Sequence, residues 1–173
     1  READVIVAVL GGTSSRFGGG EFHNNGALKA QDMATMDCGE NVDTSRLELP
    51  GDQLTLLAQL KDTGKPVVTV LIQGRPYATE AVTAHSDALF CCFYPGLTGG
   101  EALAQLLFGE AAPAGRLPVS LPDHVGQLPV YYNYKDSYRG MDYYDARERP
   151  AFSFGGGLTY TTFSYCLLAA PAD

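Results

Sequence analysis

Hydrophobic residues gather in three short runs, which are separated by polar segments that contain glycine or proline. The runs cover residues 3–10, 66–72 and 87–94, and they are rich in β-branched or aromatic side chains. Continuous apolar runs of this length are typical of strands that are buried on both faces of a parallel sheet. We therefore expect three strands at these positions.

Helical patterns lie between and after these runs. Leucines at positions 54, 56, 57 and 60 form one stripe, which follows Pro50 and ends before Pro66. Residues 79–84 predict a short helix, and residues 101–108 predict a longer one that ends at Gly109. An alternation of strands and helices indicates an α/β fold with a largely parallel sheet.

Two other parts of the chain have a different character. Residues 13–49 form a long, polar, glycine-rich stretch, and such a stretch inside a domain usually carries function. Beyond Pro118 the pattern predicts short extended pieces, then a strand-like segment over residues 159–168. Residues 166–173 are interpreted as a linker towards a following domain.

Length and charge restrict the class of protein. The chain has 173 residues, of which 45% are apolar, and this is enough for one domain with a real core. The net charge of −8 argues against nucleic acid and anionic membranes as partners, and is compatible with a neutral substrate such as a sugar. No apolar run approaches the ~20 residues of a membrane helix. No signal peptide is visible, and the chain is interpreted as a fragment whose true N-terminus lies elsewhere.

The four cysteines predict neither a metal site nor a disulfide framework. They stand at positions 38, 91, 92 and 166, without a C-x-x-C spacing. Cys91 and Cys92 are neighbours in an expected strand, so their side chains should point to opposite faces. We expect buried, reduced thiols, which favours a cytoplasmic over a secreted location.

The first candidate for chemistry is the Gly11-Gly12-Thr13-Ser14-Ser15-Arg16 segment after the first expected strand. Glycine-rich turns at the carboxyl end of a parallel strand are common ligand sites. A dinucleotide site would need a helix directly after the turn, and residues 18–20 are three glycines that would break one. We therefore interpret the turn as the start of a loop over a pocket, which Arg16 could reach.

The second candidate is the acidic segment 37–46. Gly39 and Asn41 allow a sharp turn that exposes Glu40 at its tip. Glycoside hydrolysis needs one carboxylic acid that protonates the leaving oxygen and a second carboxylate near the anomeric carbon. From the residues alone, a solvated acidic loop and a catalytic loop both remain open.

Other chemistries find little support in the sequence. There is no G-x-S-x-G elbow for a serine hydrolase, and the three histidines lack metal-ligand spacing. Tyrosines crowd residues 131–144, where they could stack on sugar rings or fill an interface, and we favour the interface.

A run of motifs then points to a known family. It comprises Tyr94-Pro95-Gly96, Gly99-Gly100, Leu107-Phe108-Gly109 and Gly115-Arg116-Leu117-Pro118. This run resembles the C-terminal domain of glycoside hydrolase family 3. Residues 154–163 (FGGGLTYTTF) resemble the family's F-G-Y-G-L-S-Y-T-x-F, with Gly156 for tyrosine and Thr159 for serine. The resemblance spans nearly the whole chain and favours the β-glucosidase and β-xylosidase branch.

The acidic loop takes part in the same resemblance. Residues 39–43 (GENVD), followed by residues 47–50 (LELP), are similar to the family's G-E-G-x-D-R and L-x-L-P. Asn41 replaces the usual glycine, and Thr44 the usual arginine. By position, the resemblance implies that Glu40 is the acid/base, with Asp37 and Asp43 as rivals for that role. We expect Arg16 and Asp43 to contact the substrate.

The resemblance implies a fold, a mechanism and partners. Residues 1–165 should form a three-layer, six-stranded α/β sandwich with a mostly parallel sheet, which is flavodoxin-like. The mechanism should be retaining, with an aspartate nucleophile on an N-terminal barrel domain of the same polypeptide, and that barrel is absent from the sequence. The expected substrate is a β-glucoside or β-xyloside, and no cofactor or metal is expected. The isolated domain should be inactive, and the sugar preference stays open.

As a general acid, Glu40 must have a pKa above the usual value of about 4.3. Burial against the barrel and the charge of the nucleophile would raise it. In the isolated chain we expect Glu40 to be exposed, mobile and normal in its titration. The alternative function is a non-catalytic α/β module that binds a ligand or partner, and a flavodoxin-like nucleotide binder is a weaker third possibility.

Overall fold

A computed structural model describes residues 2–14, 21–26, 36–39, 42–133 and 142–169. Within these residues, three strands and three helices alternate, and a short 3₁₀ helix follows them. The elements are β1 (Ile6–Gly11), α1 (Gln53–Lys61), β2 (Val67–Ile72), α2 (Glu80–Ala84), β3 (Ala88–Phe93), α3 (Gly99–Leu107) and η2 (Val125–Gln127). Each of the three apolar runs is confirmed as a strand, and each expected helix is present.

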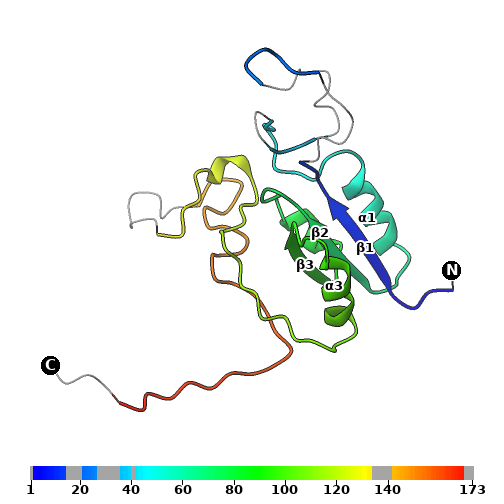
Figure 1. The fold of residues 1–173 in the computed structure, drawn as a ribbon, viewed down its shortest axis with the longest axis vertical. Helices are drawn as coiled ribbons and strands as arrows, with labels where there is room; N and C mark the ends of the chain where they lie inside the picture. Colours follow the sequence, from blue (N-terminus) through cyan, green and yellow to red (C-terminus); the bar gives the residue numbers. More distant parts are fainter. Residues whose placement is uncertain (1, 15–20, 27–35, 40–41, 134–141, 170–173) are drawn as a thin grey trace.

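The strands form one parallel sheet in the order β1-β2-β3 (Figure 1). Ile6 pairs with Val67 at one end of the first ladder, and Gly11 pairs with Ile72 at the other. The second ladder shifts its register between Leu71 and Ile72, next to the carboxyl end of the sheet. Because all the strands run in one direction, the segments that follow them emerge at the same edge.

The core lies on one face of this sheet. Ala8, Leu10, Val67 and Leu71 point from the strands into a cluster that is completed by α1, by α2 and by the loop before α1. Its other buried members are Leu49, Leu57, Tyr77 and Val82. Leu57 and Val82 are fully buried, which is the reason that α1 and α2 are held against the strands.

The opposite face of β1 is open. Val5, Val7 and Val9 alternate with the inward-facing residues, and their exposed fractions are 50%, 47% and 59%. Val70 on the neighbouring strand β2 is fully buried, so the opening is confined to the β1 side of the sheet. β1 therefore carries a row of uncovered valines at the edge of the described sheet.

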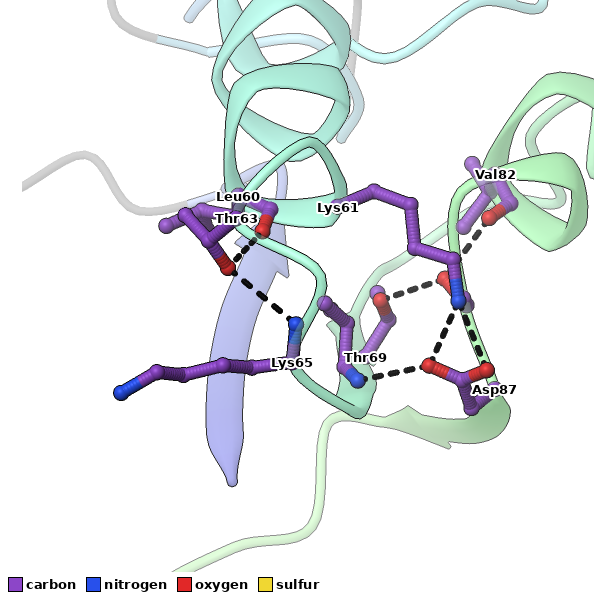
Figure 2. Close-up of polar contacts among 9 residues, drawn as sticks. Leu60, Lys61, Thr63, Lys65, Thr69, Val82 and Asp87 are labelled. Carbon is purple, nitrogen blue, oxygen red and sulfur yellow. Dashed lines mark hydrogen bonds and ion pairs between the residues drawn. The ribbon is translucent and has the colours of Figure 1, made fainter. Parts of the chain in front are cut away.

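Polar contacts fix the amino-terminal end of the sheet (Figure 2). Asp87, just before β3, accepts a 2.8 Å hydrogen bond from the backbone N–H of Val67 at the start of β2. Its two carboxylate oxygens each lie 2.7 Å from Lys61 Nζ at the end of α1. One exposed carboxylate thus joins two strands and a helix.

The described part of the chain departs from the expectations in three ways. It contains three strands, whereas the resemblance implied six. The strand expected over residues 159–168 is wrong, because that segment pairs with no described strand and extends away from the sheet (Figure 1). The expected burial of all the thiols is also wrong: Cys166 is exposed, and the others are partly buried. Among the described residues, no helix has the length and apolarity to cross a membrane.

Candidate functional site

Three segments that are distant in sequence meet at the carboxyl edge of the sheet (Figure 1). They are the turn after β1, the described residues of the acidic loop from position 36 onwards, and the segment 74–77 after β2. The backbone N–H of Asp37 donates to the carbonyl of Thr13 at 3.1 Å, which joins the first two segments. Parallel α/β sheets bind ligands at this edge, so it is the candidate site.

Asp37 is the buried centre of the site. Asp37 is only 7% exposed. One carboxylate oxygen accepts a 2.9 Å hydrogen bond from the backbone N–H of Thr13, and the other accepts one from the hydroxyl of Tyr77. Burial, followed by the carboxylate of Asp37, raises the pKa of Tyr77, so its hydroxyl stays protonated and donates. Asp37 therefore joins both neighbouring segments.

Two glycines make this close packing possible. A Cβ atom at Gly12 would collide with the Tyr77 hydroxyl and with both carboxylate oxygens of Asp37. A Cβ atom at Gly74 would lie 2.6 Å from Cys38 Sγ and 2.5 Å from the hydroxyl of Tyr94. Gly12, which the sequence marked as part of a turn, and Gly74 are thus both required by side-chain packing.

Tyr94 approaches the site from the end of β3. Its hydroxyl and Cys38 Sγ share a 3.2 Å hydrogen bond. The preceding residue, Phe93, has a φ angle of 49°, which is uncommon for a residue other than glycine. The left-handed backbone at Phe93 turns the chain where Tyr94 meets Cys38.

A tight turn follows Cys38. The backbone N–H of Val42 donates to the carbonyl of Gly39 at 3.1 Å, and these two residues form an isolated antiparallel bridge. Glu40 and Asn41 stand between them in the sequence and lie outside the described residues, as does Arg16. The expectations of an exposed, mobile Glu40 and of Arg16 near a pocket therefore stay predictions.

Asp43 leaves this turn and meets Arg75. Arg75 Nη1 lies 2.6 Å from Asp43 Oδ1, and the carboxylate also accepts a 2.8 Å bond from the N–H of Thr44. The Thr44 N–H, followed by the Arg75 guanidinium, holds the pKa of Asp43 below its usual value. Asp43 is accordingly a carboxylate at neutral pH and has no proton to donate.

A hollow of about 280 Å³ lies beside the turn. Val42, Asp43 and Arg75 line it on the side of the turn, and Leu128 and Val130 line it on the other. It combines an apolar wall with one ion pair, which suits the C–H faces and hydroxyl groups of a sugar.

A second hollow, of about 440 Å³, is lined by residues that include Glu80, Asp123, His124 and Arg147. Burial, followed by the charge of Glu80, raises the pKa of Asp123. None of the described residues of the acidic loop lines it, so it is a weaker candidate for the site. In the described ranges, no group of three or more His, Cys, Asp or Glu side chains could hold a metal ion.

Sequence reasoning missed part of the site. It found Asp43 and the loop, but it did not pair Asp37 with Tyr77 or Asp43 with Arg75. A signal was present, because Gly74-Arg75-Pro76 directly follows the second expected strand, where α/β sheets bind ligands.

Comparison with known proteins points to one family. Residues 1–160 match the model of the glycosyl hydrolase family 3 C-terminal domain. The chain belongs to this family. The periplasmic β-glucosidase of Salmonella typhimurium is 36% identical over 174 residues, which span 95% of this chain and 20% of that protein. A β-xylosidase of Formosa agariphila is 39% identical over 131 residues, which span 74% of this chain and 18% of that protein.

Solved structures show the same relationship for the family 3 domain. A β-glucosidase from Listeria innocua in complex with glucose superposes with a TM-score of 0.76 at 30% identity, over 94% of this chain and 21% of that one. A β-glucosidase from Erythrobacter marinus gives a TM-score of 0.77 at 37% identity, over 94% of this chain and 20% of that one. The chain thus spans about a fifth of the length of these relatives.

Proposed function

We propose that this domain supplies the acid/base residue, Glu40, of a retaining β-glycosidase that hydrolyses β-glucosides or β-xylosides. The observation that carries the proposal is the Gly39–Val42 turn, which is held at the carboxyl edge of the sheet by a buried Asp37. Family membership adds the reaction, since the relatives include β-glucosidases and β-xylosidases.

The two rival carboxylates are poorly suited to proton transfer. Asp37 is buried beneath hydrogen bonds from Thr13 and Tyr77, where it has no access to a leaving group. Asp43 has a lowered pKa, whereas a general acid needs a raised one. Glu40 is the remaining carboxylate of residues 37–43.

The hollow beside the turn supports a substrate-binding role for Asp43, which lines it. We assign Arg16 the same role, because it follows the turn after β1 in the sequence. A carboxylate and a guanidinium both hydrogen-bond to sugar hydroxyls.

A retaining mechanism also needs a nucleophilic carboxylate about 5–5.5 Å from the acid/base. We assign it to a barrel domain in the same polypeptide, which precedes this one. Exposed tyrosines at positions 132, 143 and 144 offer a surface on which such a domain could pack.

The complete domain is proposed to be the six-stranded sandwich that the resemblance implies, over residues 1–165, with residues 166–173 as a linker. Val5, Val7 and Val9 support this extension, since uncovered valines on an edge strand are suited to further packing. A strand beside β1 would also satisfy its free backbone groups.

The test uses the polypeptide that contains both the barrel and this domain. Glu40→Ala should lower kcat for an aryl β-glucoside or β-xyloside by about 10²–10⁴-fold, since general acid–base catalysis contributes that much. Azide should partly restore turnover on an activated substrate, because it needs no general base to attack the glycosyl-enzyme. Asp37→Asn and Asp43→Asn are the comparison variants.

Near-normal turnover of Glu40→Ala would contradict the proposal. Azide rescue of an aspartate variant in its place would move the acid/base role to that aspartate. If none of the three substitutions affects hydrolysis, the non-catalytic binding module becomes the better interpretation.

A further inference from the structure

Arg75 reaches both sides of the turn that carries Glu40. Its Nη1 atom donates to Asp43 Oδ1 at 2.6 Å and to the backbone carbonyl of Asp37 at 3.3 Å. Asp37 precedes the Gly39–Val42 turn and Asp43 follows it. A single guanidinium thus connects the entry of the turn to its exit.

Arg75 lies close to the end of β2 and is held by the sheet. Arg75 is the third residue after β2, and the backbone N–H of Gln73 between them donates to the carbonyl of Phe93 at 3.2 Å. The Arg75 side chain is only 22% exposed, whereas that of Asp43 is 86% exposed. The rigid partner of this ion pair is therefore the arginine, and the loop is the part that it restrains.

Thr13 and Tyr77 also hold the entry of the turn, whereas at its exit Arg75 provides the side-chain contact that the structure describes. The carboxylate of Asp37 is held by Thr13 and Tyr77, in addition to the bond that Arg75 makes to the Asp37 carbonyl. Within the described part of the chain, the Asp43 carboxylate bonds to the N–H of its neighbour Thr44 and to Arg75. Loss of the guanidinium would release one side of the turn and leave the other attached.

We propose that Arg75 is a positioning residue for proton transfer, because it holds both ends of the turn that carries Glu40. This inference rests on the proposed function of Glu40 as acid/base. A general acid must lie within hydrogen-bond reach of the leaving oxygen, so a turn that is held at one end only presents the acid less often. An exposed ion pair contributes little to stability, and its effect should thus be seen mainly in catalysis.

The decisive variable is the leaving group. Departure of an alkoxide or phenoxide needs a proton, whereas departure of 2,4-dinitrophenolate needs little or none. Arg75→Met in the polypeptide with its barrel should lower kcat/KM for phenyl or alkyl β-glucosides by about tenfold, a fraction of what general acid catalysis provides. The kcat/KM for 2,4-dinitrophenyl β-glucoside should stay within about twofold of wild type, because its first step does not depend on the acid.

Matched variants separate positioning from general damage. Lys61→Met breaks another partly exposed ion pair, at the opposite end of the sheet, and should leave the hydrolysis of both substrates unaffected (Figure 2). Arg75→Lys keeps the charge and should recover part of the loss, since an ammonium lacks the fixed guanidinium plane. Arg75→Gln, which removes the charge but keeps hydrogen-bond donors, serves if Arg75→Met fails to fold.

Three results have different consequences. A loss confined to poor leaving groups, with an unchanged thermal unfolding midpoint, supports the role of Arg75. If Arg75→Met loses activity equally on both substrates, or behaves like Lys61→Met, the role of Arg75 is overturned. This holds even if Glu40→Ala shows selective loss and azide rescue. If Glu40→Ala shows neither selective loss nor azide rescue, the proposed function fails, and the inference about Arg75 fails with it.

Discussion

At the scale of single residues, two buried glutamines have opposite surroundings. Gln73 is fully buried, and neither polar atom of its amide has a hydrogen-bond partner in the part of the chain that the structure describes. Gln127 is also buried, but its Nε2 donates to the carbonyls of Arg147 and Arg149, and its Oε1 accepts from the N–H of Asp123. The glutamine side chain therefore destabilises the fold at position 73 and stabilises it at position 127.

This contrast predicts opposite effects of one substitution. Gln73→Met should raise the free energy of unfolding by roughly 1 kcal/mol, because it removes an unpaired buried amide at similar volume. Gln127→Met should lower it by about 2–4 kcal/mol, because three backbone groups lose their partner. Guanidinium unfolding of both variants, monitored by circular dichroism, gives the two signs. A loss of stability in Gln73→Met would mean that its amide is satisfied by water or by another group.

At the scale of elements, exposed carboxylates organise the two ends of the sheet. Asp87 joins β2, β3 and α1 at the amino-terminal end, and Asp43 joins the acidic loop to the segment after β2 at the carboxyl end. Hydrogen bonds from Lys61, followed by the N–H of Val67, hold the pKa of Asp87 below its ordinary value of 3.8. Both contacts favour the ionised form of Asp87. The link that Asp87 makes between β2, β3 and α1 therefore depends on pH.

The Asp87 contact predicts a particular pH dependence. A carboxyl group with a lowered folded-state pKa stabilises the fold fully above its unfolded pKa, and this contribution is lost as the pH falls through the folded value. Asp87→Asn should thus lower the unfolding midpoint at pH 7, and the difference from wild type should shrink below about pH 4. Asp4→Asn removes the same charge from an exposed position and is the control. An equal deficit at pH 7 and pH 3 would contradict the assignment.

At the scale of the whole molecule, uncovered apolar surface lies on two sides of the domain. One side is the valine row of β1, and the other is the extended C-terminal segment, in which Leu158, Tyr165 and Leu168 are each at least 90% exposed. Apolar patches of this kind mark surfaces that pack against something else. Together with a length of about a fifth of the relatives, they favour a domain that works within a larger enzyme.

The proposed function then predicts that the isolated chain has no glycosidase activity. It would supply one carboxylate of a pair, and a retaining reaction needs both. Incubation with aryl β-glucosides and β-xylosides should give no release above background. Addition of the barrel as a separate polypeptide should restore hydrolysis that depends on Glu40. Turnover by the isolated chain, or restored turnover with Glu40→Ala, would contradict this.

The elements, the family and the position of the acidic loop could be predicted from the sequence, because these properties are written in neighbouring residues. Runs such as residues 66–72 have strand character whatever they pack against, and Gly39 permits a turn by its own backbone freedom. The identity of Asp37 as a buried anchor could not be predicted. Its partner Tyr77 is 40 residues away, and the close approach needs Gly12 beside both.

The tertiary structure likewise decided that Arg75, and not a nearby arginine such as Arg46, pairs with Asp43. A parallel sheet brings the ends of all its strands to one edge, so the sequence indicates which segments meet. Which side chains then form contacts depends on burial, strand register and the space left by glycine. Those quantities exist only once the chain has folded.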